Sequence, residues 1–276
     1  MQSGRIYDRH IVFLTPGTDS TLMVPWLISA RARPGAVARE ARAWLTRGGV
    51  WEPFFQERWE TAPSRVPWRL LPRGRMRIVV GEADALERIV FESGPRHLET
   101  VLGPTRVEWN GRRGESYRLL DGAALLANQR IEGLILDVSR ARRPEDPPSG
   151  DWALLTSGDS LQVLLAASEA RPPGTAGAYQ GWARLDFREL QWPRVSVSWS
   201  EARAFERARR DVPVEWRARS SDGELVAVLN VRSAQLQAGE GEGPLLPVDA
   251  LFEIEGTVTI GGIEYPVRGI HRHLQF

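Results

Sequence analysis

Two histidines near the C-terminus, His271 and His273, are the residues whose type and spacing most readily suggest chemistry. Imidazole exchanges protons near neutral pH and is a common metal ligand. A spacing of two residues places both rings on one face if the segment is a β-strand. Such a pair could bind a metal, contact a ligand in an apolar pocket or serve a structural role, and the spacing alone leaves all three open.

The element that must position these histidines is a predicted β-hairpin over residues 251–276. Two β-patterned runs flank Gly261-Gly262, and two-residue hairpin turns need the positive φ that glycine adopts readily. This turn sets Phe252 opposite His271. One face of the hairpin then carries Phe252, Ile254, Val258, Ile260, Tyr265, Val267, His271 and His273. We therefore predict that His271 points into the interior of the C-terminal half.

A metal site would need a third ligand on the same face as the histidines. Glu253 and Glu264 fall on the opposite face of the predicted hairpin. The chain has no cysteine, which removes thiolate ligands, thiol catalysis and disulfides. We therefore predict no tightly bound metal and no other cofactor.

The composition excludes several classes of function. The net charge is +1, so the electrostatic footprint of a nucleic-acid-binding protein is absent. All 36 basic residues are arginine, which excludes a Schiff-base lysine and the lysine of a phosphate-binding loop. No apolar run approaches the roughly 20 residues of a transmembrane helix. The start, Met1 to Gly4, lacks the apolar core of a signal peptide, and no compartment is predicted.

Short, evenly spaced runs of β-forming residues recur in the N-terminal half and predict an antiparallel sandwich or barrel. Pro25 suggests that the strand containing it lies at a sheet edge. One segment breaks the pattern, because apolar residues at helical spacing predict a helical insertion over residues 35–48 that ends at Gly48-Gly49. These residues are Val37, Ala41, Trp44 and Leu45. The aromatic segment 50–67 gives no clear prediction.

A domain boundary is predicted between residues 139 and 150. This segment holds three prolines and several charges without apolar periodicity, as linkers do. The expected units are residues 1–140 and 151–276. The second contains about eight predicted strands, enough to close a small barrel.

The C-terminal half also resembles a known family. Its motifs, in order, are a strand starting at Trp152, a Ser157-Gly158-Asp159 turn, a Val195–Trp199 strand, a Val212–Trp216 segment, Phe252 with Gly261-Gly262, and Gly269. This order is similar to the C-terminal domain of the carotenoid 1,2-hydratase (hydroxyneurosporene synthase) family. The resemblance implies tandem lipocalin-like domains, so the expected fold class is all-β, two antiparallel lipocalin-like β-barrels with one short helical insertion.

The resemblance extends to the fold and not to the catalytic signature. Enzymes of that family carry a histidine-containing motif where the first barrel closes. The corresponding segment here, residues 134–140, contains no histidine. The hydratase activity is therefore not implied for this chain.

The predicted function is the binding of an apolar small molecule, an isoprenoid or a lipid, in a barrel cavity. The candidate ligand-binding residues are His271, His273, Tyr265, Trp216, Trp199 and Trp182. One alternative is a cofactor-independent hydratase or cyclase acting on an isoprenoid or polyketide, in which His271, His273 and Tyr265 supply protons. Another is an interaction module with filled barrels, because tryptophans of this kind also fill barrel cores.

Overall fold

The structure, a computed structural model, describes residues 1–16, 22–63, 74–82, 85–148, 150–168 and 177–276. The chain divides into two compact units, whose main spans are residues 1–149 and 150–276. The regular elements of the described residues are all β-strands, which confirms the all-β class. No helix of the described residues has the length and hydropathy to span a membrane.

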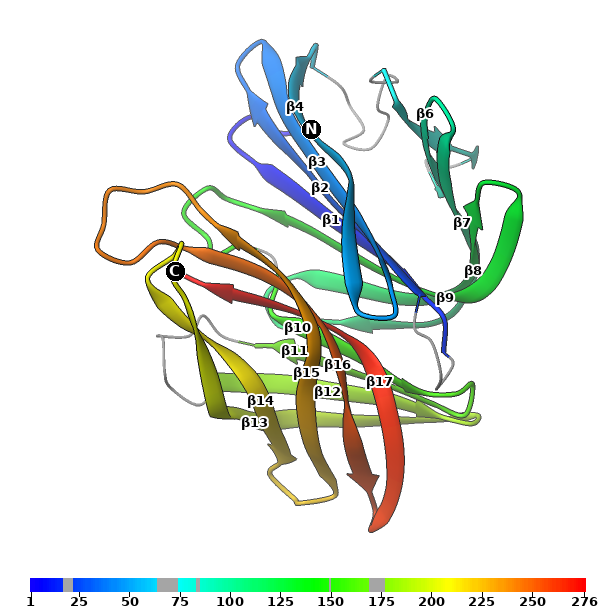
Figure 1. Cartoon of the computed structure of the whole chain (residues 1–276), viewed down its shortest axis with the longest axis vertical. Helices are drawn as coiled ribbons and strands as arrows, with labels where there is room; N and C mark the ends of the chain where they lie inside the picture. Colours follow the sequence, from blue (N-terminus) through cyan, green and yellow to red (C-terminus); the bar gives the residue numbers. More distant parts are fainter. Residues whose placement is uncertain (17–21, 64–73, 83–84, 149, 169–176) are drawn as a thin grey trace. The chain divides into compact units, whose positions relative to one another are not determined.

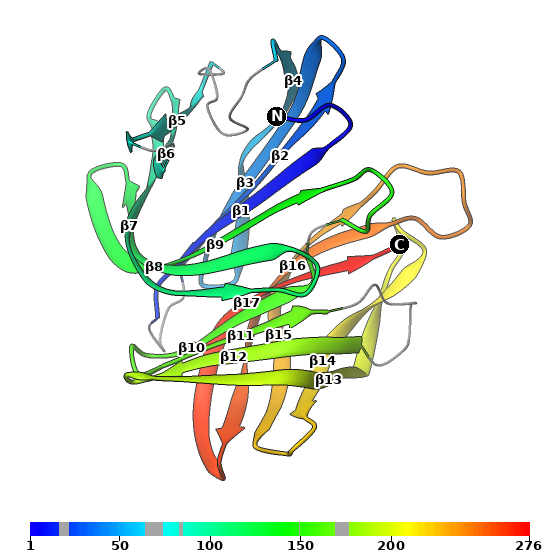
Figure 2. The same cartoon turned by 180° about the vertical axis from the view of Figure 1, so that it is seen from behind.

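The first unit is a curled antiparallel sheet of nine strands (Figure 1). Its strands are β1 (Ile6–Leu14), β2 (Leu22–Arg33), β3 (Ala36–Arg47), β4 (Val50–Thr61), β5 (Met76–Val80), β6 (Leu86–Ser93), β7 (Arg96–Asn110), β8 (Glu115–Leu126) and β9 (Gln129–Arg142). They are ordered β4-β3-β2-β1-β9-β8-β7-β6-β5. Figure 2 shows β5 at one edge, next to β6. The predicted closed N-terminal barrel is therefore wrong for the described residues, in which the sheet is open between β4 and β5.

The predicted helix at residues 35–48 is also wrong. Residues 36–47 form β3, which pairs with β2 from Arg33 opposite Ala36 to Leu22 opposite Arg47. Gly35, with φ of 75°, lies in the turn between them, and the preceding Pro34 is a turn signal that the helical spacing masked. In the strand, Val37 and Ala41 lie on one face and are buried. Both residues also satisfy a helical period, so the pattern was ambiguous and the neighbouring strand decided it.

The prediction that Pro25 lies in an edge strand is wrong. β2 lies between β1 and β3, and Pro25 pairs with Val12 of β1. The pairing with β3 runs from Met23 opposite Thr46 to Trp26 opposite Ala43 and skips Pro25. A proline, which has no N–H to donate, is tolerated at this interruption.

The inner face of the first sheet carries an apolar core and one buried charge cluster. Ile11, Phe55 and Trp59 belong to the core, which places part of the aromatic segment 50–67 within strand β4; residues 64–67 of that segment lie outside the described residues. Asp137 pairs with Ile11 across β9 and β1, so its side chain shares this face. Arg9 donates from Nε and Nη2 to the two carboxylate oxygens of Asp137, at 2.9 and 2.8 Å.

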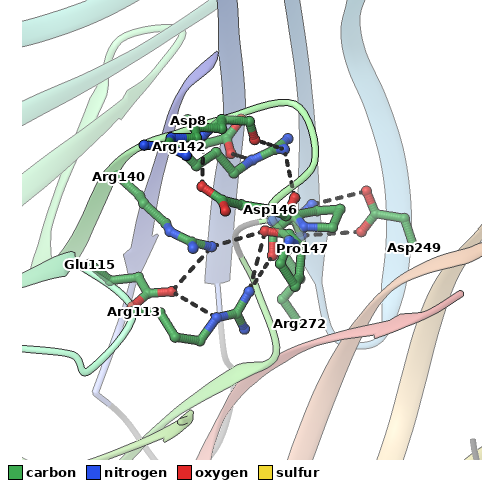
Figure 3. Close-up of polar contacts among 11 residues, drawn as sticks. Asp8, Arg113, Glu115, Arg140, Arg142, Asp146, Pro147, Asp249 and Arg272 are labelled. Atoms are coloured by element: carbon green, nitrogen blue, oxygen red, sulfur yellow. Dashed lines mark hydrogen bonds and ion pairs between the residues drawn. The ribbon is translucent and has the colours of Figure 1, made fainter. Parts of the chain in front are cut away.

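The proline-rich segment after β9 is held by arginines of the first unit (Figure 3). Arg140 donates to the carbonyl oxygen of Pro147 at 2.9 Å, and Arg113 donates to that of Pro148 at 3.1 Å. The Nη1 atom of Arg140 also lies 3.5 Å from the Glu115 carboxylate. The segment predicted as a linker is therefore fixed to the first unit through residue 148.

The second unit is a closed barrel of eight antiparallel strands, drawn in green to red in Figure 1. Its strands are β10 (Trp152–Ser157), β11 (Leu161–Ala167), β12 (Gly177–Leu185), β13 (Arg188–Phe205), β14 (Arg210–Ser220), β15 (Leu225–Ala238), β16 (Val248–Ile260) and β17 (Ile263–Gln275). Each strand pairs with the next, and β17 pairs with β10 to close the barrel. The first and last strands therefore become neighbours only when the whole unit folds.

The predicted register of the terminal hairpin is confirmed. Phe252 lies opposite His271 and Ile260 opposite Ile263. Gly261 and Gly262 have φ of 57° and 85°, the left-handed conformation that the turn requires.

Candidate histidine–aspartate site

Strand β17 carries both histidines on the inner face of the barrel. His271 is 2% exposed and His273 is 1% exposed. Phe252, which pairs with His271, belongs to the apolar core of the barrel. The prediction that His271 points inward is confirmed.

A carboxylate from the other end of the unit joins the two histidines. Asp151 precedes β10, in which Ala153 pairs with His271. Its Oδ1 atom lies 3.0 Å from Nε2 of His271, and its Oδ2 atom lies 3.2 Å from Nδ1 of His273. Closure of the barrel thus brings one carboxylate between two imidazoles in the buried interior of the second unit.

Asp151 is held by its backbone and by a tyrosine. The hydroxyl of Tyr179, in β12, donates to Oδ1 at 2.6 Å. The Asp151 carbonyl accepts from the N–H of Ala167 at 2.9 Å. Its φ of 57° is a left-handed value that few residues other than glycine adopt, and aspartate is among the more tolerant of them. These contacts fix the carboxylate in one orientation.

The carboxylate of Asp151 is stabilised in its ionised form. Burial by itself would raise the pKa of this carboxyl, but the charge of His273 and hydrogen bonds from His271 and His273 outweigh it. The net effect is a pKa well below the usual range of aspartate. The site therefore contains a buried, ionised carboxylate in contact with two imidazoles.

Aromatic rings enclose the histidines. The ring of Trp216 in β14 lies 4.6 Å from that of His271, and the ring of Trp199 in β13 lies 5.3 Å from that of His273. Phe252 packs edge-on against Trp216 at 5.1 Å. Two buried polar atoms in this enclosure, Nε2 of His273 and Nε1 of Trp216, have no hydrogen-bond partner among the described residues.

The same residues are the candidate metal ligands of the described chain. Asp151, His271 and His273 each offer one ligand atom, and the three atoms lie within 4.8 Å of one another. The expectation of no bound metal rested on the lack of a third ligand near the histidines. Asp151 supplies that ligand, so the premise does not hold, although the expectation itself is untested.

Two of the six candidate residues lie elsewhere. Tyr265 pairs with Val258 nearer the hairpin turn, and its six-residue separation from His271 corresponds to about 20 Å along a strand. Trp182 is buried but lies next to Ala183, which belongs to the inner core, so the two side chains take opposite faces of β12. The structure brings together His271, His273, Trp216 and Trp199.

Sequence reasoning missed Asp151 and Tyr179, which the structure adds to the site. Neither stands in a motif with the histidines, and Asp151 is separated from His271 by 120 positions. The only local signal was an acid at the start of the first strand of the predicted barrel. Since the strands of a closed barrel include a first–last pair, that acid could have been considered as a neighbour of β17.

Comparisons with known proteins identify the fold. No protein-family model and no curated protein sequence matches the chain. A solved structure of a putative AttH from Nitrosomonas europaea is similar over 99% of this chain and 92% of that one, with a TM-score of 0.65 and 14% identity. Kievitone hydratase from Nectria haematococca matches over 98% of this chain and 87% of its own, with a TM-score of 0.56 and 12% identity. CghA matches over 97% and 86%, with a TM-score of 0.53 and 10% identity.

These matches place the chain in a structural class. It has a lipocalin-like all-β fold similar along nearly its whole length to the folds of the putative AttH, kievitone hydratase and CghA. At identities of 10–14% the likeness concerns the fold alone. The particular activity has to be argued from the site.

Proposed function

We propose that the closed barrel of the second unit binds an apolar small molecule, an isoprenoid or a lipid, through a single polar group placed against His273 and Trp216. The observation that carries this proposal is the pair of buried polar atoms, Nε2 of His273 and Nε1 of Trp216, that lack partners among the described residues. A buried polar atom without a hydrogen bond costs about 1–3 kcal/mol. A ligand hydroxyl could satisfy both, because it donates one hydrogen bond and accepts others.

The surroundings favour a ligand that is otherwise apolar. The rings of Trp199 and Phe252 lie against the histidines, and both side chains belong to or pack against the apolar core of the barrel. Small-molecule sites commonly combine such walls with a few polar groups that orient the ligand. An isoprenoid alcohol or a lipid with one oxygen function has the matching chemistry.

A second candidate, a cofactor-independent hydratase or cyclase, is favoured by the Asp151–His273 contact. A carboxylate 3.2 Å from Nδ1 holds the proton of the neutral ring on that nitrogen, which leaves Nε2 as a base. The aspartate of a serine protease orients its histidine in the same way. In hydration, Nε2 would take a proton from water as the hydroxide equivalent adds to the substrate. The protonated ring would then return that proton to the product carbanion or enolate.

Binding is tested with two matched probes, farnesol and the hydrocarbon farnesene, by quenching of tryptophan fluorescence. Native mass spectrometry of gently purified protein would also reveal a co-purified lipid. We expect wild type to bind farnesol about tenfold more tightly than farnesene, which corresponds to one hydrogen bond of about 1.4 kcal/mol. His273→Phe should lose this preference and bind both probes alike. His97→Gln, a half-exposed histidine of the first unit, is the control.

The outcomes separate the three functions. Conversion of an isoprenoid whose double bond is conjugated to a carbonyl into the β-hydroxy carbonyl product, carrying heavy oxygen from labelled water, would establish the catalytic candidate if it is lost in His273→Phe. If neither probe binds and His273→Phe raises the melting temperature, the ligand proposal is wrong and a filled interaction module remains.

A further inference from the structure

We propose that Asp151, His271 and His273 bind a divalent transition-metal ion of the zinc class inside the barrel of the second unit. Each residue presents one donor atom, namely a carboxylate oxygen of Asp151, Nε2 of His271 and Nδ1 of His273. The three donor atoms lie within 4.8 Å of one another. Two imidazoles and one carboxylate are a donor set used by zinc and by other first-row ions.

The distances suit ligands that share one ion. Bonds of about 2.0–2.2 Å from a metal place neighbouring ligand atoms roughly 3–3.5 Å apart. From Oδ1 of Asp151 the separations are 3.0 Å to Nε2 of His271 and 3.4 Å to Nδ1 of His273. The two imidazole nitrogens lie within 4.8 Å of each other, so binding an ion would require them to approach by at most roughly 1.5 Å.

Tyr179 supplies a contact that metal-binding carboxylates ordinarily have. Its hydroxyl donates to Oδ1 of Asp151 at 2.6 Å, which restrains the carboxylate. The rings of Trp216 and Trp199 lie against those of His271 and His273 and restrain the imidazoles. Such supporting contacts orient the ligands and raise metal affinity.

An ion at this site would stabilise the closed barrel. The histidines lie on the last strand of the barrel and Asp151 lies at the start of the first, so the ion would join β17 to β10. The ligands are far apart in the unfolded chain, which means that binding favours the folded barrel. Removal of the ion is therefore expected to lower the unfolding temperature.

The alternative is a metal-free cluster in which both imidazoles donate N–H groups to Asp151. Coordination through Nδ1 of His273 moves the ring proton to Nε2, whereas the metal-free cluster keeps it on Nδ1. A ligand hydroxyl can accept from Nε2 as well as donate to it. Ligand binding, the subject of the proposed function, is therefore independent of the ion, and each can fail alone.

The test uses tag-free full-length protein purified without chelator. Elemental analysis is expected to show about one zinc per chain after dialysis against zinc, and cobalt substitution is expected to give visible absorption bands. Treatment with a chelator should lower the melting temperature, and added zinc should restore it.

Three variants locate the ion. Asp151→Asn and His273→Gln should each lose stoichiometric metal, and Tyr179→Phe should weaken binding by about 10–100-fold. His97→Gln, whose ring lies 3.5 and 3.8 Å from two glutamates of the first unit, should keep the metal. Near-ultraviolet circular dichroism shows which variants fold. Because Asp151→Asn and His273→Gln alter different ligands, either one tests the site if the other fails to fold.

Two results would overturn the proposal. One is wild-type protein that holds no zinc or cobalt after dialysis and whose melting temperature does not respond to chelator. The other is a folded Asp151→Asn or His273→Gln variant that binds metal as wild type does. Farnesol binding retained in either case would leave the proposed function standing.

Discussion

The hydroxyl of Tyr179 lies 2.6 Å from carboxylate oxygen Oδ1 of Asp151, which also lies 3.0 Å from Nε2 of His271. One buried oxygen thus links β12, the start of β10 and β17. The barrel interior is otherwise apolar around this point, because Trp216 and Phe252 pack beside the histidines. Every group that contacts the carboxylate is therefore important for its stability as an ion.

Tyr179→Phe should destabilise the folded state by about 1.5–3 kcal/mol, since it removes a hydrogen bond to a charged group and leaves the ring in place. Denaturant unfolding followed by tryptophan fluorescence measures the change. Tyr265→Phe, a partly buried residue that lies elsewhere on the inner face, is the matched control and should have a smaller effect. Equal stability of Tyr179→Phe and wild type would show that this hydrogen bond contributes nothing.

Asp137→Asn should be strongly destabilising. Its carboxylate is 1% exposed and is bound by Arg9 and Arg118, and breaking a buried ion pair costs about 3–5 kcal/mol. The control is Asp121→Asn, which breaks a pair with Arg106 at a carboxylate that is 47% exposed and should cost about 0–1 kcal/mol. Thermal unfolding of the two variants should separate them clearly, and similar losses would contradict the role of burial.

Acid should remove the stabilisation that Asp137 provides. Burial by itself raises the pKa of this carboxyl, but hydrogen bonds and charges from Arg9 and Arg118 lower the pKa by a larger amount. The folded-state pKa of Asp137 therefore lies below the ordinary value. Its contribution is therefore complete above the unfolded pKa of about 3.9 and is lost as pH falls from there through the folded pKa. Unfolding free energy measured against pH should show a smaller decline below pH of about 4 in Asp137→Asn than in wild type. A decline of the same size in both would assign it to other groups.

Gly269→Ala should disturb the closure of the barrel. A Cβ atom at this position would lie 1.8 Å from the carbonyl oxygen of Leu154, on the paired strand β10. Overpacking of this kind costs about 1–3 kcal/mol, and here the obstacle is backbone. Gly243→Ala, where the nearest atom would be 3.5 Å away, should be tolerated. Comparable melting temperatures of the two variants would contradict the close approach of β17 and β10.

The fragment 150–276 should fold alone. Its barrel is closed by its own first and last strands, and the members of its core all come from this unit. The expected results are cooperative thermal unfolding and a near-ultraviolet circular dichroism signal from its buried tryptophans. A fragment without either would show that the second unit depends on the first.

The terminal hairpin shows how much of the site was predictable. Gly261-Gly262 set the register, and the alternation of residues placed His271 and Phe252 on one buried face. The prediction worked because a two-residue turn determines pairing through short-range geometry. The sequence named Trp216, Trp199, Tyr265 and Trp182 as ligand-binding candidates, and that role stays a prediction. The structure places the rings of Trp216 and Trp199 beside the histidines, whereas Tyr265 lies further along the strand and Trp182 is on the other face.

The helix predicted at residues 35–48 shows the opposite case. Val37 and Ala41 fit both a helix and a strand, so local periodicity could not distinguish them. Pairing with β2 along the length of β3 provided the backbone hydrogen bonds that made the strand the stable choice.

By itself, the sequence determined the all-β class, the register of the last hairpin and the inward direction of its histidines, because these depend on turn geometry and on alternation within one strand. Only the tertiary structure brought Asp151 and Tyr179 to those histidines. Their meeting depends on the pairing of β10 with β17, two strands at opposite ends of the unit. No local pattern encodes that pairing, since it forms only when the apolar faces of all eight strands are buried together and the barrel closes.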